Sequence, residues 1–389
     1  MRVSKKLLWI GLPLATIAVG LAFGLKSFAN PGPKMPNLTA AQAGVKVVTL
    51  ARGLENPWGL AFLPNGQLLV TEKPGRLRFV DSAGTLSEPI TGLPAISTDA
   101  QGGLLGLALD PNFASNQRIY MSFSEPDPDM PERNGTAVLR ARLSGAALTE
   151  VTVIWRQAPK MESDYHFGSR LVFDREGYLY VTTGERYIGM KDAQKTNNAI
   201  GKVVRITTDG APAPGNPFLQ DAAGFDEVFS YGHRNLQGAA LHPETGVLWT
   251  HEHGPRGGDE LNIIRPGRNY GWPEITYGID YDMSTITEYT AKPGMEQPIH
   301  YWVPSIAPSG MTFYTADKYP GWKGNILIGS LAHSRLVRLV IEGEKVMQEI
   351  QMLGELEERL RDVVQGPDGY IYLLTDNEDG RILRLDPAA

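Results

Sequence analysis

The 389-residue sequence contains no cysteine. This absence excludes disulfide bonds, thiolate-bound metals, a cysteine nucleophile and a lipid-bearing N-terminal cysteine. An excess of positive charge is also missing, because 37 Lys and Arg stand against 43 Asp and Glu, a formal net charge of −6. Such a chain is poorly suited to neutralising a phosphate backbone, so we expect no nucleic-acid partner. Hydrophobic residues make up 42% of the sequence, which is enough for a large core.

A long uncharged stretch occurs only at the N-terminus. Three basic residues within the first six precede an apolar run over residues 7–25, which is followed by a Ser-Phe-Ala sequence. This order is typical of a secretory signal peptide, although the length of the run would also suit a membrane anchor. We assign residues 1–29 to this signal or anchor and residues 30–44, rich in Pro and small residues, to a linker. Both interpretations place the rest of the chain in the periplasm or otherwise outside the cytoplasm.

One pattern recurs six times in the rest of the chain. A Gly or polar residue is followed by small and apolar residues, a turn with Pro, Asp or Gly, and a short apolar strand that commonly ends in Thr or Ser. Short β-rich strands joined by such turns form antiparallel hairpins. A paired-strand unit repeated every roughly 50–70 residues favours a β-propeller, and the lack of long helical periodicity excludes an α-solenoid. The copies span residues 59–71, 106–122, 171–182, 238–250, 310–328 and 362–375.

The two ends of the repeat region predict how the ring closes. The last copy and the following residues 380–386 supply only three evident strands, whereas residues 45–50 form a strand that belongs to no copy. Pairing this N-terminal strand with the last blade would complete the sheet and remove an exposed edge. The sequence therefore predicts an all-β fold in which residues 45–389 form a single six-bladed β-propeller.

Unusual polar residues cluster in segments that lie between the apolar strands. Loops on a rigid scaffold are a common location for functional residues. The segments are Gln101-Gly-Gly-Leu-Leu105, Tyr165-His-Phe-Gly-Ser-Arg170, Ser230-Tyr-Gly-His-Arg-Asn-Leu-Gln-Gly238, His251-Glu-His-Gly-Pro-Arg-Gly-Gly-Asp-Glu-Leu-Asn262, Gly267-Arg-Asn-Tyr-Gly-Trp-Pro273 and Arg359-Leu-Arg-Asp362.

The combination of these segments resembles the aldose sugar dehydrogenases that depend on pyrroloquinoline quinone (PQQ), in the soluble quinoprotein glucose dehydrogenase family. The similarity runs from about Val45 to the C-terminus. It implies a six-bladed propeller, in agreement with the repeat count, as a monomer or homodimer. It also implies that an aldose is oxidised at C1 to the lactone, with a hydride passed to the quinone and the electrons to an external acceptor. PQQ and Ca²⁺ are the cofactors that the resemblance implies.

The resemblance also assigns roles to individual residues. His166 matches the histidine that takes the hydroxyl proton, a role that suits a neutral imidazole near neutral pH. Guanidinium groups suit the carboxylates of PQQ because two parallel hydrogen bonds form. Arg359 and Arg361 are two apart, so an extended segment would project both to one face. The residues that match cofactor contacts are Gln101, Arg234, Asn235, His253, Tyr281, Arg359 and Arg361.

The resemblance implies calcium at two places. One ion would be held against PQQ by the carbonyls of Gly254 and Pro255, in a loop that Asp259 supports. A second, structural ion would use the carboxylate of Glu260 and the carbonyl of Tyr270. Hard cations prefer oxygen ligands, and a cation beside the quinone would stabilise the charge that develops there.

Alternatives remain for the metal and for the function. His251 and His253 are two apart on a strand and would share a face, so zinc is the alternative metal for this segment. A calcium-dependent lactonase and a non-catalytic binding propeller are the alternative functions, since propellers host many activities.

Three positions bear on the strength and specificity of the resemblance. Ala332 stands where the family usually has a Lys that reaches PQQ, with His333 as a neighbouring substitute. Tyr165 precedes the predicted base at a position where the glucose-oxidising branch has Asp. Glu185 is an acidic residue after a strand and has no assigned role. Cofactor affinity and the preferred sugar therefore stay open.

Overall fold

The computed structural model describes residues 37–388, so the predicted signal or anchor over residues 1–29 lies outside the described part. Nearly all regular structure in residues 37–388 is β-strand. The helices of this part are short, and none is long and apolar enough to cross a membrane. They are α1 (Phe113–Asn116), η1 (Met190–Gln194) and η2 (Gly354–Leu356).

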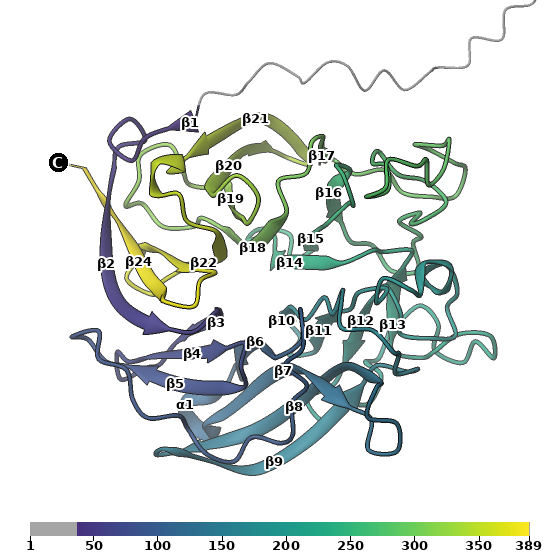
Figure 1. The fold of residues 1–389 in the computed structure, drawn as a ribbon, viewed down its shortest axis with the longest axis horizontal. Helices are drawn as coiled ribbons and strands as arrows, with labels where there is room; N and C mark the ends of the chain where they lie inside the picture. Colours follow the sequence, from purple (N-terminus) through teal and green to yellow (C-terminus); the bar gives the residue numbers. More distant parts are fainter. Residues whose placement is uncertain (1–36, 389) are drawn as a thin grey trace, which may run out of the picture. The chain divides into compact units, whose positions relative to one another are not determined.

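Six antiparallel sheets stand around a common centre, which confirms the predicted six-bladed β-propeller (Figure 1). Blade 1 contains β3 (Pro57–Phe62), β4 (Leu68–Glu72) and β5 (Arg76–Val80); blade 2 contains β6 (Leu104–Leu109), β7 (Arg118–Pro126), β8 (Asn134–Ser144) and β9 (Ala147–Arg156). Blade 3 contains β10 (Leu171–Phe173), β11 (Leu179–Thr182), β12 (Lys202–Ile206) and β13 (Val228–Tyr231); blade 4 contains β14 (Leu236–Leu241), β15 (Leu248–Glu252), β16 (Asp259–Ile263) and β17 (His300–Trp302). Blade 5 contains β18 (Pro308–Phe313), β19 (Ile326–Ser330), β20 (Arg335–Glu342) and β21 (Lys345–Met352); blade 6 contains β22 (Leu360–Gln365), β23 (Ile371–Thr375) and β24 (Gly380–Pro387).

The N-terminal strand closes the ring, as the sequence predicts. β2 (Val45–Leu54) pairs antiparallel with β24 and forms the fourth strand of blade 6 (Figure 1). β1 (Asn37–Leu38), which falls within the segment assigned to a linker, pairs in parallel with β21 at the outer edge of blade 5. Each innermost strand contacts the innermost strands of both neighbouring blades, and β22 contacts β3. The ring is therefore continuous.

The Ser or Thr that ends several repeats links one blade to the next. The Ser122 hydroxyl accepts the backbone N–H of Gly106 in its own blade at 2.8 Å and donates to the carbonyl of Ser169, before blade 3, at 2.6 Å. A side chain at Gly106 would place Cβ 2.2 Å from that carbonyl oxygen, so only glycine fits this approach. Thr71 and Thr182 donate to the next blade in the same way. The sequence repeat therefore includes the residues that join the blades.

Apolar packing is distributed around the ring. Each interface between adjacent blades has its own cluster of buried apolar side chains, for example Leu69 with Ile119 between blades 1 and 2 and Trp249 with Ile328 between blades 4 and 5. The apolar core thus lies between the blades, whereas polar side chains meet near the centre.

Arg170 is the central polar side chain. Its guanidinium donates to Asp362 Oδ1 at 2.8 Å and to the Gln237 carbonyl at 2.7 Å, and it lies 4.1 Å from the centre of the Trp58 ring. Arg170 precedes blade 3, whereas Trp58, Gln237 and Asp362 belong to blades 1, 4 and 6. Burial raises the pKa of Asp362, and the neighbouring Arg170 opposes this rise. One buried ion pair therefore joins four blades.

We expect Arg170→Met to lower the free energy of unfolding by about 3–5 kcal/mol, because it leaves the Asp362 carboxylate buried without a cation. Adding Asp362→Asn to this variant should restore part of the loss. Urea unfolding followed by tryptophan fluorescence measures both effects. Lys323→Met, which breaks an exposed ion pair with Asp317, is the control and should change stability by less than about 1 kcal/mol. A double variant no more stable than Arg170→Met would contradict this account of the ion pair.

Candidate active site

A cavity of about 350 Å³ opens where the innermost strands of the blades begin. All six blades or the segments that precede them contribute to its wall. Trp58, Leu105 and Phe167 supply apolar surface, whereas most of the remaining lining is polar. Five of the seven predicted cofactor contacts lie together in this wall. They are Gln101, Asn235, His253, Arg359 and Arg361.

Irregular strand starts aim side chains into this cavity. Five of the six innermost strands, β3, β6, β14, β18 and β22, have a shift of register close to their first residue. Such bulges bend a strand and redirect its side chains. Asn235 directly precedes β14, and Arg359 directly precedes β22. The fold therefore places the polar residues of different loops around one space.

Positive charge dominates the wall contributed by blades 1 and 6. Asp376 Oδ2 accepts hydrogen bonds from Arg359 at 2.9 Å and from Arg361 at 3.0 Å. Burial alone would raise the pKa of Asp376, but the two guanidinium groups outweigh it and lower the pKa below its usual value. Lys73 lines the same wall, so three cations face one carboxylate. Within the described residues, the buried Nε of Arg361 has no hydrogen-bond partner.

Hydrogen bonds hold both the ring and the backbone of His166, which adjoins the cavity-lining residues Gln101 and Phe167. Glu185 Oε1 lies 2.8 Å from its Nδ1, and its backbone N–H donates to Gln101 Oε1 at 2.9 Å. A carboxylate accepts hydrogen bonds, so Nδ1 carries the proton and Nε2 keeps a lone pair. Burial and the charge of Arg234 lower the pKa of His166, while Glu185 opposes them. The side chain is 6% exposed, and the lowered pKa favours the neutral imidazole near neutral pH.

Residues 184–186 fix the backbone around His166. Arg186 is buried and donates to the Tyr165 carbonyl at 2.8 Å, with its guanidinium 3.9 Å from the centre of the Phe167 ring. A Cβ at Gly184 would lie 2.0 Å from the His166 carbonyl oxygen, so a side chain has no room there. His166 and Arg186 have φ angles of 53° and 62°, a left-handed conformation that costs energy in a non-glycine residue. Glu185 thus orients the ring while its neighbours hold the main chain.

Arg234 lies between the His166–Glu185 pair and the following loop. Its Nη1 donates to the carbonyls of His253 and Gly254 at 3.0 and 3.2 Å, and its Nε lies 4.0 Å from Glu185 Oε1. Among the described residues, neither this Nε nor the buried Glu185 Oε2 has a hydrogen-bond partner. Tyr281 is 52% exposed and its ring lies 6.0 Å from the Arg234 guanidinium. Of the predicted cofactor contacts, Arg234 and Tyr281 are the two that do not line the central cavity.

The loop that was predicted to bind the first calcium ion is supported by Asp259, as expected. Its carboxylate accepts the backbone N–H groups of Gly254 at 2.9 Å and Ile306 at 2.7 Å. Burial raises the pKa of Asp259 to about 6, although these hydrogen bonds oppose the rise. The carbonyl of Gly254, a predicted calcium ligand beside Pro255, already accepts the hydrogen bond from Arg234.

The alternative zinc site has too few ligands. His253 donates to the Pro308 carbonyl at 2.6 Å, and burial lowers its pKa to about 3. His251 packs against Gly238 of β14, where an added Cβ would lie 2.0 Å from its Nε2. Over residues 37–388 no group of three or more His, Cys, Asp or Glu residues is arranged to hold a metal ion. His251 is therefore a packed residue of β15, whereas His253 lines the central cavity and is held by the Pro308 carbonyl.

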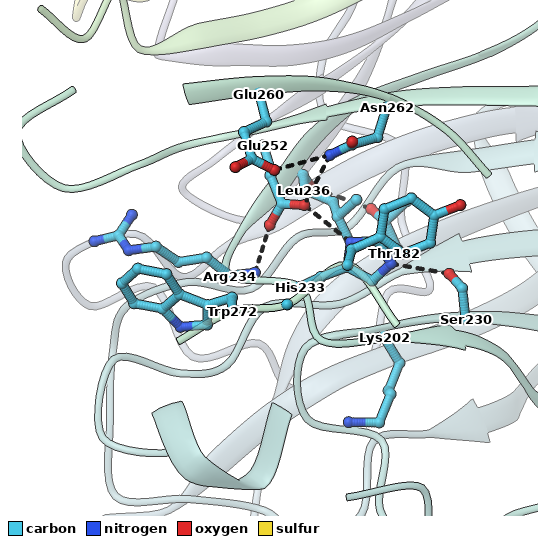
Figure 2. A network of polar contacts seen from close by, with 12 residues as sticks. Thr182, Lys202, Ser230, His233, Arg234, Leu236, Glu252, Glu260, Asn262 and Trp272 are labelled. Atoms are coloured by element: carbon cyan, nitrogen blue, oxygen red, sulfur yellow. Dashed lines mark hydrogen bonds and ion pairs between the residues drawn. The ribbon is translucent and has the colours of Figure 1, made fainter. Parts of the chain in front are cut away.

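A second, small cavity contains a pair of buried carboxylates. Glu252 on β15 and Glu260 on β16 are directly opposite in the sheet, and Asn262 donates to both, at 3.4 and 3.2 Å (Figure 2). Glu252 also accepts from His233 Nδ1 at 2.9 Å. Burial and the charge of Glu252 raise the pKa of Glu260 well above its usual value. The cavity of about 10 Å³ also touches Tyr270, so Glu260 and Tyr270 lie together as predicted.

Sequence reasoning missed several residues of the site, although the repeat contains a signal for them. Lys73, Glu185, His253 and Asp376 all follow, by one to three positions, a Thr that lies at or near the end of the second strand of a blade. These strands run toward the cavity, so the residues after them reach it. In this group the sequence predicts a role for His253 alone; it singles out Glu185 without a role and misses Lys73 and Asp376. Arg186 has no comparable signal, because its role depends on carbonyl groups from a different loop.

Comparisons with known proteins agree on one family. The family profile described as glucose/sorbosone dehydrogenase matches residues 54–384. Aldose sugar dehydrogenase YliI of Escherichia coli is 43% identical over 355 residues, which cover 90% of this chain and 95% of that protein. A solved glucose dehydrogenase has 49% identity and a TM-score of 0.85, with 87% and 99% of the two chains covered. The PQQ-bound aldose sugar dehydrogenase of Streptomyces coelicolor has 32% identity and a TM-score of 0.73, with 88% and 98% covered.

Proposed function

The chain belongs to the glucose/sorbosone dehydrogenase family, and from this premise we propose that it oxidises aldose sugars at C1 to the lactone with PQQ as its cofactor. The observation on which the proposal depends is the neutral His166, which Glu185 orients and which bonds to Gln101 in the wall of a cavity with an excess of cations. An oriented neutral imidazole is a competent general base. A cationic cavity selects an anionic ligand.

The residues present fit PQQ. A tricarboxylate needs several fixed cations, and Lys73, Arg359 and Arg361 face the cavity against the single carboxylate of Asp376. The buried Nε of Arg361 has no hydrogen-bond partner among the described residues, so a donor remains for a ligand. Asn235 and Gln101 add polar contacts to the same wall.

His166 would take the proton of the sugar C1 hydroxyl at Nε2, while the C1–O bond becomes a carbonyl. PQQ, when bound, supplies the acceptor for the hydride that leaves C1, and an external acceptor takes the electrons afterwards. Glu185 stabilises the imidazolium that forms and keeps the proton of Nδ1 directed away from the sugar, in the manner of the carboxylate of a catalytic triad. Product release requires His166 to lose the added proton, which its lowered pKa favours.

The two predicted calcium sites differ in the oxygen ligands that are available to an ion. At Gly254 and Pro255 an ion would have to share a carbonyl with the Arg234 guanidinium, so we assign no step to it. At the small cavity, two opposed carboxylates are buried together, and like charges placed directly opposite in a sheet destabilise it. A cation bound by Glu260 and the Tyr270 carbonyl would relieve this repulsion, with oxygen ligands that calcium prefers.

We also propose that the protein works outside the cytoplasm, with residues 1–29 as its export signal or membrane anchor. The order of basic, apolar and small residues in that segment supports this assignment.

The first prediction concerns the reaction itself. Apoprotein supplied with PQQ and calcium should reduce an artificial dye in the presence of aldoses, measured over a panel of sugars. His166→Gln should keep PQQ binding and lose about 10²–10⁴-fold in turnover, because it removes the general base. Unchanged turnover in the variant would remove His166 from this role. Lactone hydrolysis without PQQ would instead favour a lactonase, and neither activity would favour a binding propeller.

The second prediction concerns pH. His166 must be neutral to accept a proton, so the acid limb of kcat/KM should have its midpoint below 6.5, the ordinary histidine value. Glu185 raises the pKa of His166, so Glu185→Gln should move this midpoint to still lower pH and reduce the plateau. Glu176→Gln, at an exposed position, is the matched control and should leave the profile unchanged. A midpoint that moves upward in Glu185→Gln would contradict the assigned contact.

The third prediction concerns calcium and stability. Without PQQ, calcium at 100 times its Kd should stabilise the wild type by about 2–3 kcal/mol in thermal unfolding. Glu260→Gln should abolish this response. In a chelator it should be more stable than the wild type, because an amide avoids the cost of keeping a carboxyl buried beside Glu252, the same cost that raises the pKa of Glu260. Glu274→Gln, an exposed variant, is the control. An equal calcium response in Glu260→Gln and the wild type would place the ion elsewhere.

A further inference from the structure

Lys73 lies in the turn between β4 and β5 and lines the central cavity. Its Nζ donates to the Ala100 carbonyl at 2.7 Å. That neutral acceptor is the hydrogen-bond partner of Nζ among residues 37–388, whereas Arg359 and Arg361 share the carboxylate of Asp376. Lys73 is thus the cation of this wall with no carboxylate at hydrogen-bonding distance.

Three cations in one wall repel one another. Burial lowers the pKa of Lys73, and Arg361 and Arg359 lower it further, while Asp376 opposes them. One carboxylate leaves two positive charges uncompensated, and partial burial strengthens this repulsion. An anionic ligand would compensate them and gain charge-assisted hydrogen bonds. A bound anion would therefore give Lys73 the negatively charged partner that it lacks among the described residues.

Lys73 and the uncharged part of the cavity wall come from different blades. Blade 5 contributes Ala307, Leu331 and Ala332, none of which has a charge. Lys73 comes from blade 1, next to the arginines of blade 6, because these two blades are neighbours in the closed ring. All three cations can therefore reach the same end of a flat anionic ligand.

We propose that Lys73 is a cofactor-binding residue, which pairs with a carboxylate of PQQ alongside Arg359 and Arg361. This inference rests on the proposed function. Nζ would exchange its bond to the Ala100 carbonyl for a charged hydrogen bond, and it takes no part in the proton transfer to His166.

Binding of PQQ to the apoprotein tests the proposal without any turnover. Titration followed by quenching of tryptophan fluorescence, with Trp58 in the cavity wall, and by calorimetry gives the Kd. Lys73→Met should weaken binding about 10–100-fold, as expected for the loss of a hydrogen bond between charged groups. Lys73→Arg should bind within about threefold of the wild type, since the charge is retained. Lys46→Met removes an exposed lysine of β2 and should leave the Kd unchanged.

The salt dependence of Kd provides a second readout. Lys73→Met should show a shallower rise of Kd with ionic strength than the wild type, because one charge contact is gone. Thermal unfolding of each apoprotein checks that the variant folds, and Lys73→Gln replaces Lys73→Met if the latter does not. A Kd in the folded variant equal to that of the wild type overturns the role of Lys73. A wild type that does not bind PQQ at all overturns the proposed function instead.

Discussion

A ring of blades forces polar groups together at its centre, and these groups must satisfy one another because little water reaches them. The Arg170–Asp362 ion pair meets this constraint for four blades at once. The Ser and Thr hydroxyls of second strands meet it for neighbouring blades, by bonding to carbonyls in or just before the next innermost strand. Because the same strand ends continue into the cavity wall, the contacts that close the ring also position the site.

The charges of the two cavities are of opposite sign, although both are next to Arg234. The larger cavity has an excess of cations, whereas the smaller one holds Glu252 and Glu260. Arg234 lines the smaller cavity, and its Nε, which has no hydrogen-bond partner among the described residues, lies 4.0 Å from Glu185 Oε1. An anion in the first space and a cation in the second would each lower the energy of the apoprotein. The two sites are therefore complementary parts of one electrostatic arrangement.

Much of this architecture was predictable from the sequence because it is repeated. The six copies, the closure by residues 45–50 and the group of Gln101, Asn235 and Arg359 all follow from local patterns and the family resemblance. The partners of Arg170 were not predictable, since Asp362 lies 192 residues away and no local pattern links the two. Arg186 is similar, because its acceptors are main-chain carbonyls whose position depends on the folded loop.

The environment of His166 explains why such contacts must be non-local. A histidine with φ of 53° holds its conformation only if surrounding groups fix both its ring and its main chain. Glu185 fixes the ring and Arg186 fixes the main chain. Both reach His166 because Gly184, which has no side chain, lets the segment after β11 approach the His166 carbonyl. A local motif and the family resemblance are enough to single out His166 in the sequence. The orientation of its ring comes from residues that follow the next strand, so His166 and its supports form a single unit of the third blade.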